Sequence, residues 1–91
     1  MEQIELNLSD CQTREELHTC IRDALDFPAY YGMNLDALFD LLSTESRPTR
    51  LVIAYPAEPC DALRTYWPLL LRVFDNAALE NDRLQIIFKE A

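Results

Sequence analysis

The stretch Leu51-Val52-Ile53-Ala54-Tyr55 decides the fold, because it is among the longest apolar runs in a chain of 91 residues. Side chains alternate between the two faces of a strand, so an unbroken apolar run predicts a strand that is apolar on both faces. Such a strand belongs in the middle of a sheet. A polar loop over residues 44–49 precedes it and prolines follow it, which sets its limits.

Apolar patterns near the two ends of the chain predict the neighbouring strands. Ile4, Leu6 and Leu8 alternate with polar residues, the period of two typical of a strand with one buried face. We therefore expect a first strand over residues 2–8. Residues 84–88, Leu-Gln-Ile-Ile-Phe, predict a third strand that closes the chain.

Two helices are expected between the first and second strands. Thr13 followed three residues later by Glu16 is a capping-box signature. An apolar stripe at helical spacing then predicts a helix to about Asp26, before Pro28, with a core face made of Leu17, Cys20, Ile21, Ala24 and Leu25. Gly32 supplies flexibility in the aromatic loop that follows. Asn34 is placed to cap a second helix, whose apolar stripe is Leu35, Leu38 and Leu42.

One more long helix is expected between the second and third strands. Its apolar positions at helical spacing are Leu70, Val73, Phe74 and Ala77. The three prolines Pro56, Pro59 and Pro68 are assigned to the connector before it, which has room for one short helical turn around residues 61–66.

The resulting order β, α, α, β, α, β predicts an α/β fold. Helical crossovers are long enough to join parallel strands in the right-handed sense. We expect a three-stranded parallel sheet packed against three to four helices in two layers, forming a single domain over residues 1–91.

Composition restricts the classes of partner. Sixteen acidic residues against eight basic ones give a net charge of −8 at pH 7. This balance argues against nucleic acid or an anionic membrane, because polyanion binding needs Lys and Arg, and it favours a basic protein. No apolar run approaches the ~20 residues that span a bilayer, and the first residues lack the basic segment of a signal peptide, so we expect a cytoplasmic protein.

Cofactor and metal sites are not indicated. Gly32 is the single glycine, whereas phosphate-binding loops and dinucleotide fingerprints need several. Cys11, Cys20 and Cys60 are an odd number without paired spacing, which predicts packed, reduced thiols rather than a disulfide framework or a zinc site.

The residues between Asp23 and Ser46 contain acids and aromatics but no Lys or Arg. Asp36 and Asp40 stand four residues apart on one exposed helix face, where like charges repel by a few tenths of a kcal/mol. Asp36 gains from the positive end of the helix dipole, so a merely solvated face is one interpretation. Asp40 lies near mid-helix and gains little from the helix dipole. An acidic surface edged by Tyr and Phe also suits protein docking, since carboxylates accept hydrogen bonds from Arg.

Residues 28–40, Pro-Ala-Tyr-Tyr-Gly-Met-Asn-Leu-Asp-Ala-Leu-Phe-Asp, resemble the signature of the barstar family of intracellular ribonuclease inhibitors. The family pattern is a proline, a Tyr-Tyr-Gly loop, Asn-Leu-Asp-Ala-Leu, an aromatic residue and an Asp. Length, acidity and element order extend the resemblance more weakly over the whole chain. The resemblance implies a small α/β domain, monomeric when free, whose second helix and preceding loop plug the active site of a basic ribonuclease, either extracellular or a toxin.

The resemblance also assigns roles to single residues. Tyr30 would lie against the catalytic base of the ribonuclease, and Asp36 and Asp40 would meet its phosphate-binding Arg and Lys groups, with Asp40 as the principal phosphate mimic. Phe39 stands where the family usually has tryptophan, and Ser43 where a threonine hydroxyl contributes. An outlying acidic contact would fall near Asn76, with Asp75 and Glu80 only nearby. The complete set of expected partner-binding residues is Tyr30, Tyr31, Gly32, Asn34, Leu35, Asp36, Phe39, Asp40 and Ser43.

An enzyme is not expected. His18, the only histidine, follows Leu17 directly and is interpreted as a solvated residue off the apolar stripe rather than a general base. Asp36 and Asp40 share one helix face, whereas the carboxylates of a glycosidase flank a cleft from opposite sides. The alternative to an inhibitor is an acidic interaction module that has the barstar fold but binds a basic protein other than a ribonuclease.

Overall fold

The computed structural model describes residues 1–90 and contains one three-stranded sheet. Its strands are β1 (Glu2–Asn7), β2 (Thr49–Tyr55) and β3 (Leu84–Glu90), paired in parallel in the order β1-β2-β3. The register places Ile53 between Leu6 and Phe88, so an apolar row crosses one face of the sheet. The central position of β2 is confirmed.

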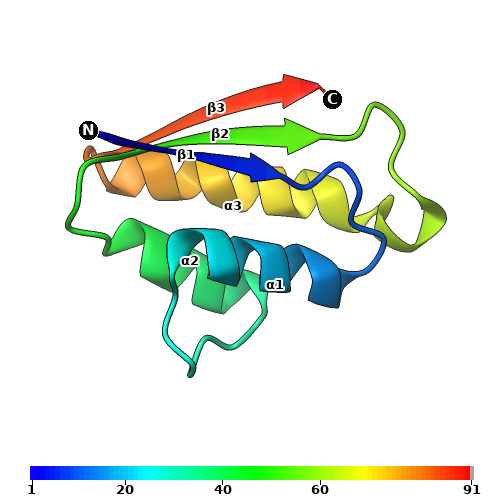
Figure 1. Ribbon diagram of the computed structural model, residues 1–91, viewed down its shortest axis with the longest axis horizontal. Coiled ribbons are helices and arrows are strands. Elements are labelled where there is room, and N and C mark those ends of the chain that lie inside the picture. Colours follow the sequence, from blue (N-terminus) through cyan, green and yellow to red (C-terminus); the bar gives the residue numbers. More distant parts are fainter. Residues whose placement is uncertain (91) are drawn as a thin grey trace.

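Three α-helices and a short 3-10 helix connect the strands. They are α1 (Arg14–Leu25), α2 (Leu35–Ser43), the 3-10 helix η1 (Asp61–Leu63) and α3 (Tyr66–Glu80). Figure 1 shows α1, α2 and α3 on the same side of the sheet. Helices α1 and α3 contact the sheet, whereas α2 packs mainly against α3. The predicted α/β architecture with a three-stranded parallel sheet is therefore confirmed, and α3 is the support on which α2 rests.

The second face of the sheet is not covered by any helix in the part of the chain that the structure describes. Along one row of this face the register aligns Glu5, Val52 and Ile87, of which Ile87 is exposed. Parallel sheets are usually covered on both faces. Within residues 1–90, the apolar side chains of β2 are therefore covered by helices on one face of the sheet but not on the other.

The ends of α1 and α2 are set by the residues that the sequence indicates. The Thr13 hydroxyl accepts a hydrogen bond from the Glu16 amide at 3.0 Å, while the Glu16 carboxylate accepts one from the Gln12 amide at 2.8 Å. Helix α1 ends at Leu25 because Asp26 adopts the left-handed conformation, with φ 55°, before the chain reaches Pro28. The Asn34 side chain caps α2 by accepting from the Ala37 amide at 2.8 Å.

The start of α3 differs from the prediction. Pro68 was assigned to the connector, but it is the third residue of α3, which begins at Tyr66. A proline is tolerated there because the first amide groups of a helix have no partner within the helix. The predicted helical turn in the connector is present as η1.

The expectation that His18 is solvated is wrong. His18 is fully buried, and its two ring nitrogens each lie 2.6 Å from a tyrosine hydroxyl, those of Tyr31 and Tyr66. Residues 18, 21 and 25 share a helical face by their spacing of three and four, and Ile21 and Leu25 are both buried. The core face of α1 is therefore wider than the predicted stripe and includes His18.

Two smaller expectations about side-chain packing are also corrected. Cys60 is exposed rather than packed, because it lies in the connector beside η1, whereas Cys11 and Cys20 are partly buried. Ala24 lies at the exposed edge of α1 rather than in its core face. Among residues 1–90, no helix is long and apolar enough to cross a membrane.

Candidate functional site: the acidic face of α2 and its preceding loop

Helix α2 has a core side and a solvent side. Leu38 and Leu42 are buried and Leu35 is partly buried, as the predicted stripe requires. Asp36 and Asp40 are exposed. Four residues along a helix correspond to about 6 Å, so the two carboxylates are neighbours on one face.

Neither of these carboxylates is neutralised by a basic side chain in the described part of the chain. The three ion pairs found within residues 1–90 are Arg22–Asp23, Arg47–Glu45 and Arg64–Asp61. The carboxylates of Asp36 and Asp40 accept no hydrogen bond from any of these residues. Their acceptor oxygens are therefore free for cationic groups on another molecule.

The two adjacent tyrosines of the loop have opposite environments. Tyr30 is 82% exposed, so its ring projects into solvent, whereas Tyr31 is only 5% exposed. Burial raises the pKa of the Tyr31 hydroxyl, and its ring centroid lies 5.0 Å from that of Phe27. Of the two predicted contact residues, Tyr30 is accessible in the free protein and Tyr31 anchors the loop.

Gly32 is needed for space rather than for flexibility. The left-handed residue in this loop is Met33, with φ 57°, and Gly32 has no positive φ. A Cβ atom on Gly32 would lie 3.1 Å from Asn34 Nδ2 and 3.3 Å from Ala37 Cβ. The Asn34 amide group also donates to the Gly32 carbonyl at 3.1 Å. The glycine therefore lets the loop approach the beginning of α2 closely.

Phe39 and Ser43 complete the face. Phe39 is partly buried and packs against the core, so its ring is not largely exposed in the free protein. It lies at the border between the apolar stripe and the acids. Ser43 is also partly buried, and its hydroxyl donates to the Asp40 carbonyl at 3.3 Å. Only part of each side chain is available to another molecule.

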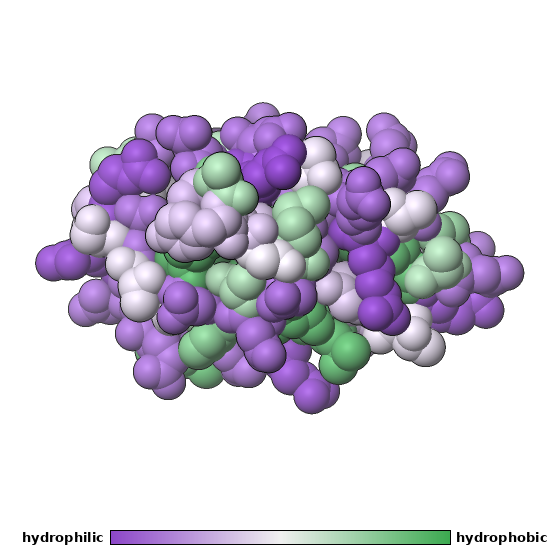
Figure 2. Space-filling model, turned by 90° about the horizontal axis from the view of Figure 1, so that it is seen from below, coloured by the Kyte–Doolittle hydropathy of each residue, from purple (hydrophilic) through white to green (hydrophobic). Residues whose placement is uncertain are grey.

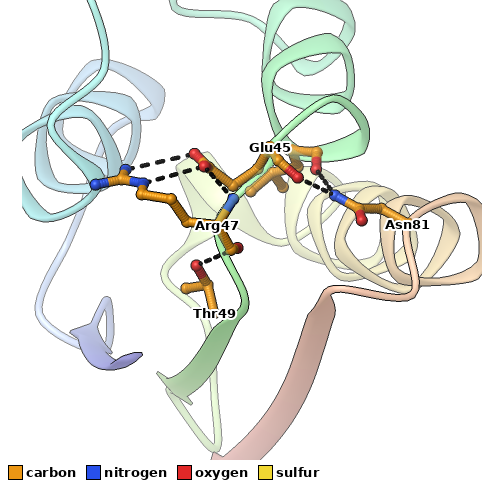
Figure 3. Close-up of polar contacts among 5 residues, drawn as sticks. Glu45, Arg47, Thr49 and Asn81 are labelled. Carbon is orange, nitrogen blue, oxygen red and sulfur yellow. Dashed lines mark hydrogen bonds and ion pairs between the residues drawn. The ribbon is translucent and has the colours of Figure 1, made fainter. Parts of the chain in front are cut away.

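The far end of α2 is fixed by a polar contact from the end of α3. The Asn81 amide nitrogen donates to the carbonyls of Leu42, at 3.0 Å, and Glu45, at 2.9 Å (Figure 3). Beside it, hydrogen bonds from Arg47 hold the pKa of the Glu45 carboxyl below its usual value. Asn81 therefore adds a side-chain donor to the Leu42 carbonyl, which also accepts from the Glu45 amide at 3.3 Å, and joins the segment after α2 to the end of α3.

The molecular surface on this side is mainly hydrophilic. Figure 2 looks onto the helical side of the molecule and shows hydrophobic atoms only in small, separate patches. This surface differs from the continuous apolar patch of an obligate interface. It matches a docking surface in which charge and a few aromatic anchors dominate.

Comparison with known proteins agrees with this geometry. A family model described as "Barstar (barnase inhibitor)" matches residues 1–89. This chain belongs to the barstar family. It is also 49% identical over 43 residues to a protein of Bacillus subtilis (strain 168) named "Putative ribonuclease inhibitor YrdF", a match that covers 47% of each chain. The chain thus aligns with about half the length of that relative.

The barstar fold brings the predicted residues together on one loop and one helix, but it gives them different tasks. Tyr30, Asp36 and Asp40 are exposed, whereas Tyr31 and Asn34 hold the backbone. Sequence reasoning missed three buried polar residues behind the site: His18, Tyr66 and Asn81. For His18 the spacing to Ile21 and Leu25 carried a signal. For Tyr66 and Asn81 there was no local signal, because their partners are distant in sequence.

Proposed function

We propose that this protein inhibits a basic ribonuclease by covering its active site with the acidic face of α2 and the loop before it. The observation that carries the proposal is the pair of exposed carboxylates, Asp36 and Asp40, which no cation within residues 1–90 neutralises. The fully presented ring of Tyr30 lies in the loop before them. Membership of the barstar family and the name of the B. subtilis relative support the ribonuclease as the class of partner.

In this proposal the protein binds and does no chemistry. A cationic active site that holds RNA phosphates supplies Arg and Lys groups, and carboxylates accept hydrogen bonds from such groups at short distance. In the ribonuclease active site, Asp40 takes the place of an RNA phosphate and Asp36 occupies a neighbouring position. Tyr30 covers the catalytic base. We further propose that the protein acts in the cytoplasm as an immunity protein against an extracellular or toxin ribonuclease, and that it is monomeric when free.

The direct test measures inhibition of barnase, the ribonuclease named in the family description, by the wild type and by Asp40→Asn. The asparagine keeps the size of the side chain and removes its charge. Losing one member of a charge pair that becomes buried on binding costs about 2 to 5 kcal/mol, a range drawn in part from this family, or about 30-fold or more in affinity.

Asp10→Asn is the matched control, because Asp10 is exposed and lies outside the stretch between Asp23 and Ser46, which has acidic but no basic residues and is hereafter the acid-only segment. It changes the net charge equally, so it separates a local contact from a general effect of charge. Equal inhibition by the wild type and Asp40→Asn would contradict the assigned surface. If the wild type binds a basic protein other than a ribonuclease through the same face, the protein is an interaction module with the barstar fold.

A further inference from the structure

The loop that carries Tyr30 is joined to the rest of residues 1–90 by one buried side-chain hydrogen bond, beside the packing of Phe27, Tyr31 and Met33 on the core. Within residues 27–34, the Asn34 side chain bonds only to the loop itself and to the start of α2. The single side-chain hydrogen bond from this segment to another part of residues 1–90 joins Tyr31 Oη to His18 Nδ1, at 2.6 Å. Apolar packing holds the loop on the core, and His18 supplies the one directional side-chain contact to it within residues 1–90.

His18 is in turn held by α3. Its Nε2 atom lies 2.6 Å from the hydroxyl oxygen of Tyr66, the first residue of α3, which is 6% exposed. The Arg14 guanidinium lies over the Tyr66 ring, 4.4 Å from its centroid. The contact therefore joins three elements: α3, α1 and the loop.

The chemistry of imidazole makes the two hydrogen bonds dependent on each other. A neutral histidine carries one N–H donor and one acceptor nitrogen, so one tyrosine donates its hydroxyl proton and the other accepts. Burial keeps the pKa of His18 below its usual value, which favours this neutral form. The bond to Tyr66 holds the ring orientation, and thus the position from which Nδ1 meets Tyr31, while in either tautomer the two tyrosines take opposite donor and acceptor roles.

We propose that Tyr66, acting through His18, is a positioning residue that holds Tyr31 and so presents Tyr30 in its binding position before any partner arrives. The effect of Tyr66 on binding rests on the proposed function. Its effect on the position of the loop concerns the free protein alone. Loss of the Tyr66 hydroxyl leaves a buried histidine nitrogen without a partner, which loosens the ring and the loop behind it.

The first experiment measures amide hydrogen exchange in the free protein for Tyr66→Phe, which removes one oxygen atom and leaves the ring. The reporter is the Tyr31 amide, which donates to the Pro28 carbonyl at 3.0 Å. We expect its exchange to accelerate about tenfold or more relative to the amides of β2. Tyr55→Phe is the matched control, because the Tyr55 hydroxyl makes no hydrogen bond within residues 1–90.

An equal increase of the exchange rates in β2 and in the loop would mean that Tyr66 serves only general stability. An unchanged exchange rate at the Tyr31 amide would mean that Tyr66 does not hold the loop. Either result overturns the proposal. Should Tyr66→Phe fail to fold, Tyr31→Phe breaks the other bond of His18 and must show the same selective effect on the loop. These results do not require a ribonuclease, so they stand even if the proposed function fails.

The second experiment measures inhibition of barnase with a double-mutant cycle. Tyr66→Phe should weaken inhibition several-fold although Tyr66 is buried away from the binding face. If Tyr66 acts by presenting Tyr30, most of this loss must disappear in a Tyr30→Ala background. Additive losses would contradict the positioning role, whereas failure of the wild type to inhibit would contradict the proposed function instead.

Discussion

Replacement of Asn81 by aspartate tests how firmly the end of α3 holds the end of α2. Asn81 is 8% exposed, and its amide nitrogen donates to two carbonyls while its oxygen accepts from the Arg83 amide at 3.1 Å. The two carbonyls on one side and the N–H group on the other determine which side-chain atom is nitrogen. Asn81→Asp keeps the shape and the bond to Arg83, but it turns a donor into an acceptor that faces two other acceptors.

The magnitude follows from the bonds that are lost. Two hydrogen bonds at about 1 kcal/mol each account for about 2 kcal/mol, and an unsatisfied buried group adds about 1 to 3 kcal/mol. The free energy of unfolding at pH 7 should therefore fall by about 3 to 5 kcal/mol. That is a large part of the roughly 5 to 15 kcal/mol typical of a domain. Asn76→Asp is the matched control, because Asn76 is exposed on α3 and makes no side-chain hydrogen bond within residues 1–90.

Urea unfolding followed by circular dichroism at pH 7 and at lower pH provides the assay. When the introduced carboxyl group is protonated, it donates to one of the two carbonyls, so the folded variant binds the proton more tightly and the pKa of this group lies above the ordinary value of about 3.9. The deficit relative to the wild type is therefore complete above the folded pKa and shrinks as the pH falls through it. An Asn81→Asp protein within about 1 kcal/mol of the Asn76→Asp control at pH 7 would refute the reasoning.

Three further predictions concern the acidic charges, the burial of His18 and the packing of Phe39. Association with a basic ribonuclease should slow strongly from low salt to physiological salt while dissociation changes much less, because the charges of the acid-only segment attract the partner at long range. Stopped-flow kinetics measures both rates, and an association rate that does not depend on salt would contradict docking through this face. The pKa of His18 is lowered by burial, so the unfolded state takes up its proton first and stability is lost as the pH falls below about 6.5. His18→Gln should be less stable than the wild type at pH 7.5, yet lose less stability on acidification to pH 5. Urea titrations in which both proteins lose the same free energy of unfolding between these pH values would contradict this. Phe39→Trp should change the free energy of unfolding by less than about 1 kcal/mol, because one side of the ring faces outward, whereas Phe39→Ala should cost about 1 to 3 kcal/mol; thermal melts in which both variants lose equally would place Phe39 fully in the core.

Local patterns predicted the elements of this fold well. Alternation located the strands, and the caps at Thr13 and Asn34 located the helix starts, because these signals lie within a few residues of the structure they control. The acid-only segment located the candidate site for a similar reason, since its residues belong to one loop and one helix. The position of Phe39 at the border between the apolar stripe and the acids was also predictable, and the ring packs there against the core.

Contacts between distant parts of the chain were not predictable in the same way. The position of His18 directly after Leu17, off the apolar stripe, predicts a solvated side chain, whereas two tyrosine hydroxyls, 13 and 48 residues away, satisfy its ring nitrogens in the core. A buried polar group is stable only when its partners are present, and a single sequence does not show which segments meet. The same holds for Asn81, whose acceptors lie 36 and 39 residues earlier in the chain.

These buried polar contacts explain how α2 can present an unneutralised face. Repulsion between Asp36 and Asp40 costs a few tenths of a kcal/mol, and a helix of nine residues has little stability of its own. Packing of Leu38 and Leu42 on the core compensates for both, while Asn81 fixes the end of the helix and its cap fixes the start. Because the helix and its loop are held from behind, binding a cationic partner requires little ordering of the backbone. In the proposed complex, affinity then depends on the carboxylates and Tyr30 rather than on the formation of the surface that carries them.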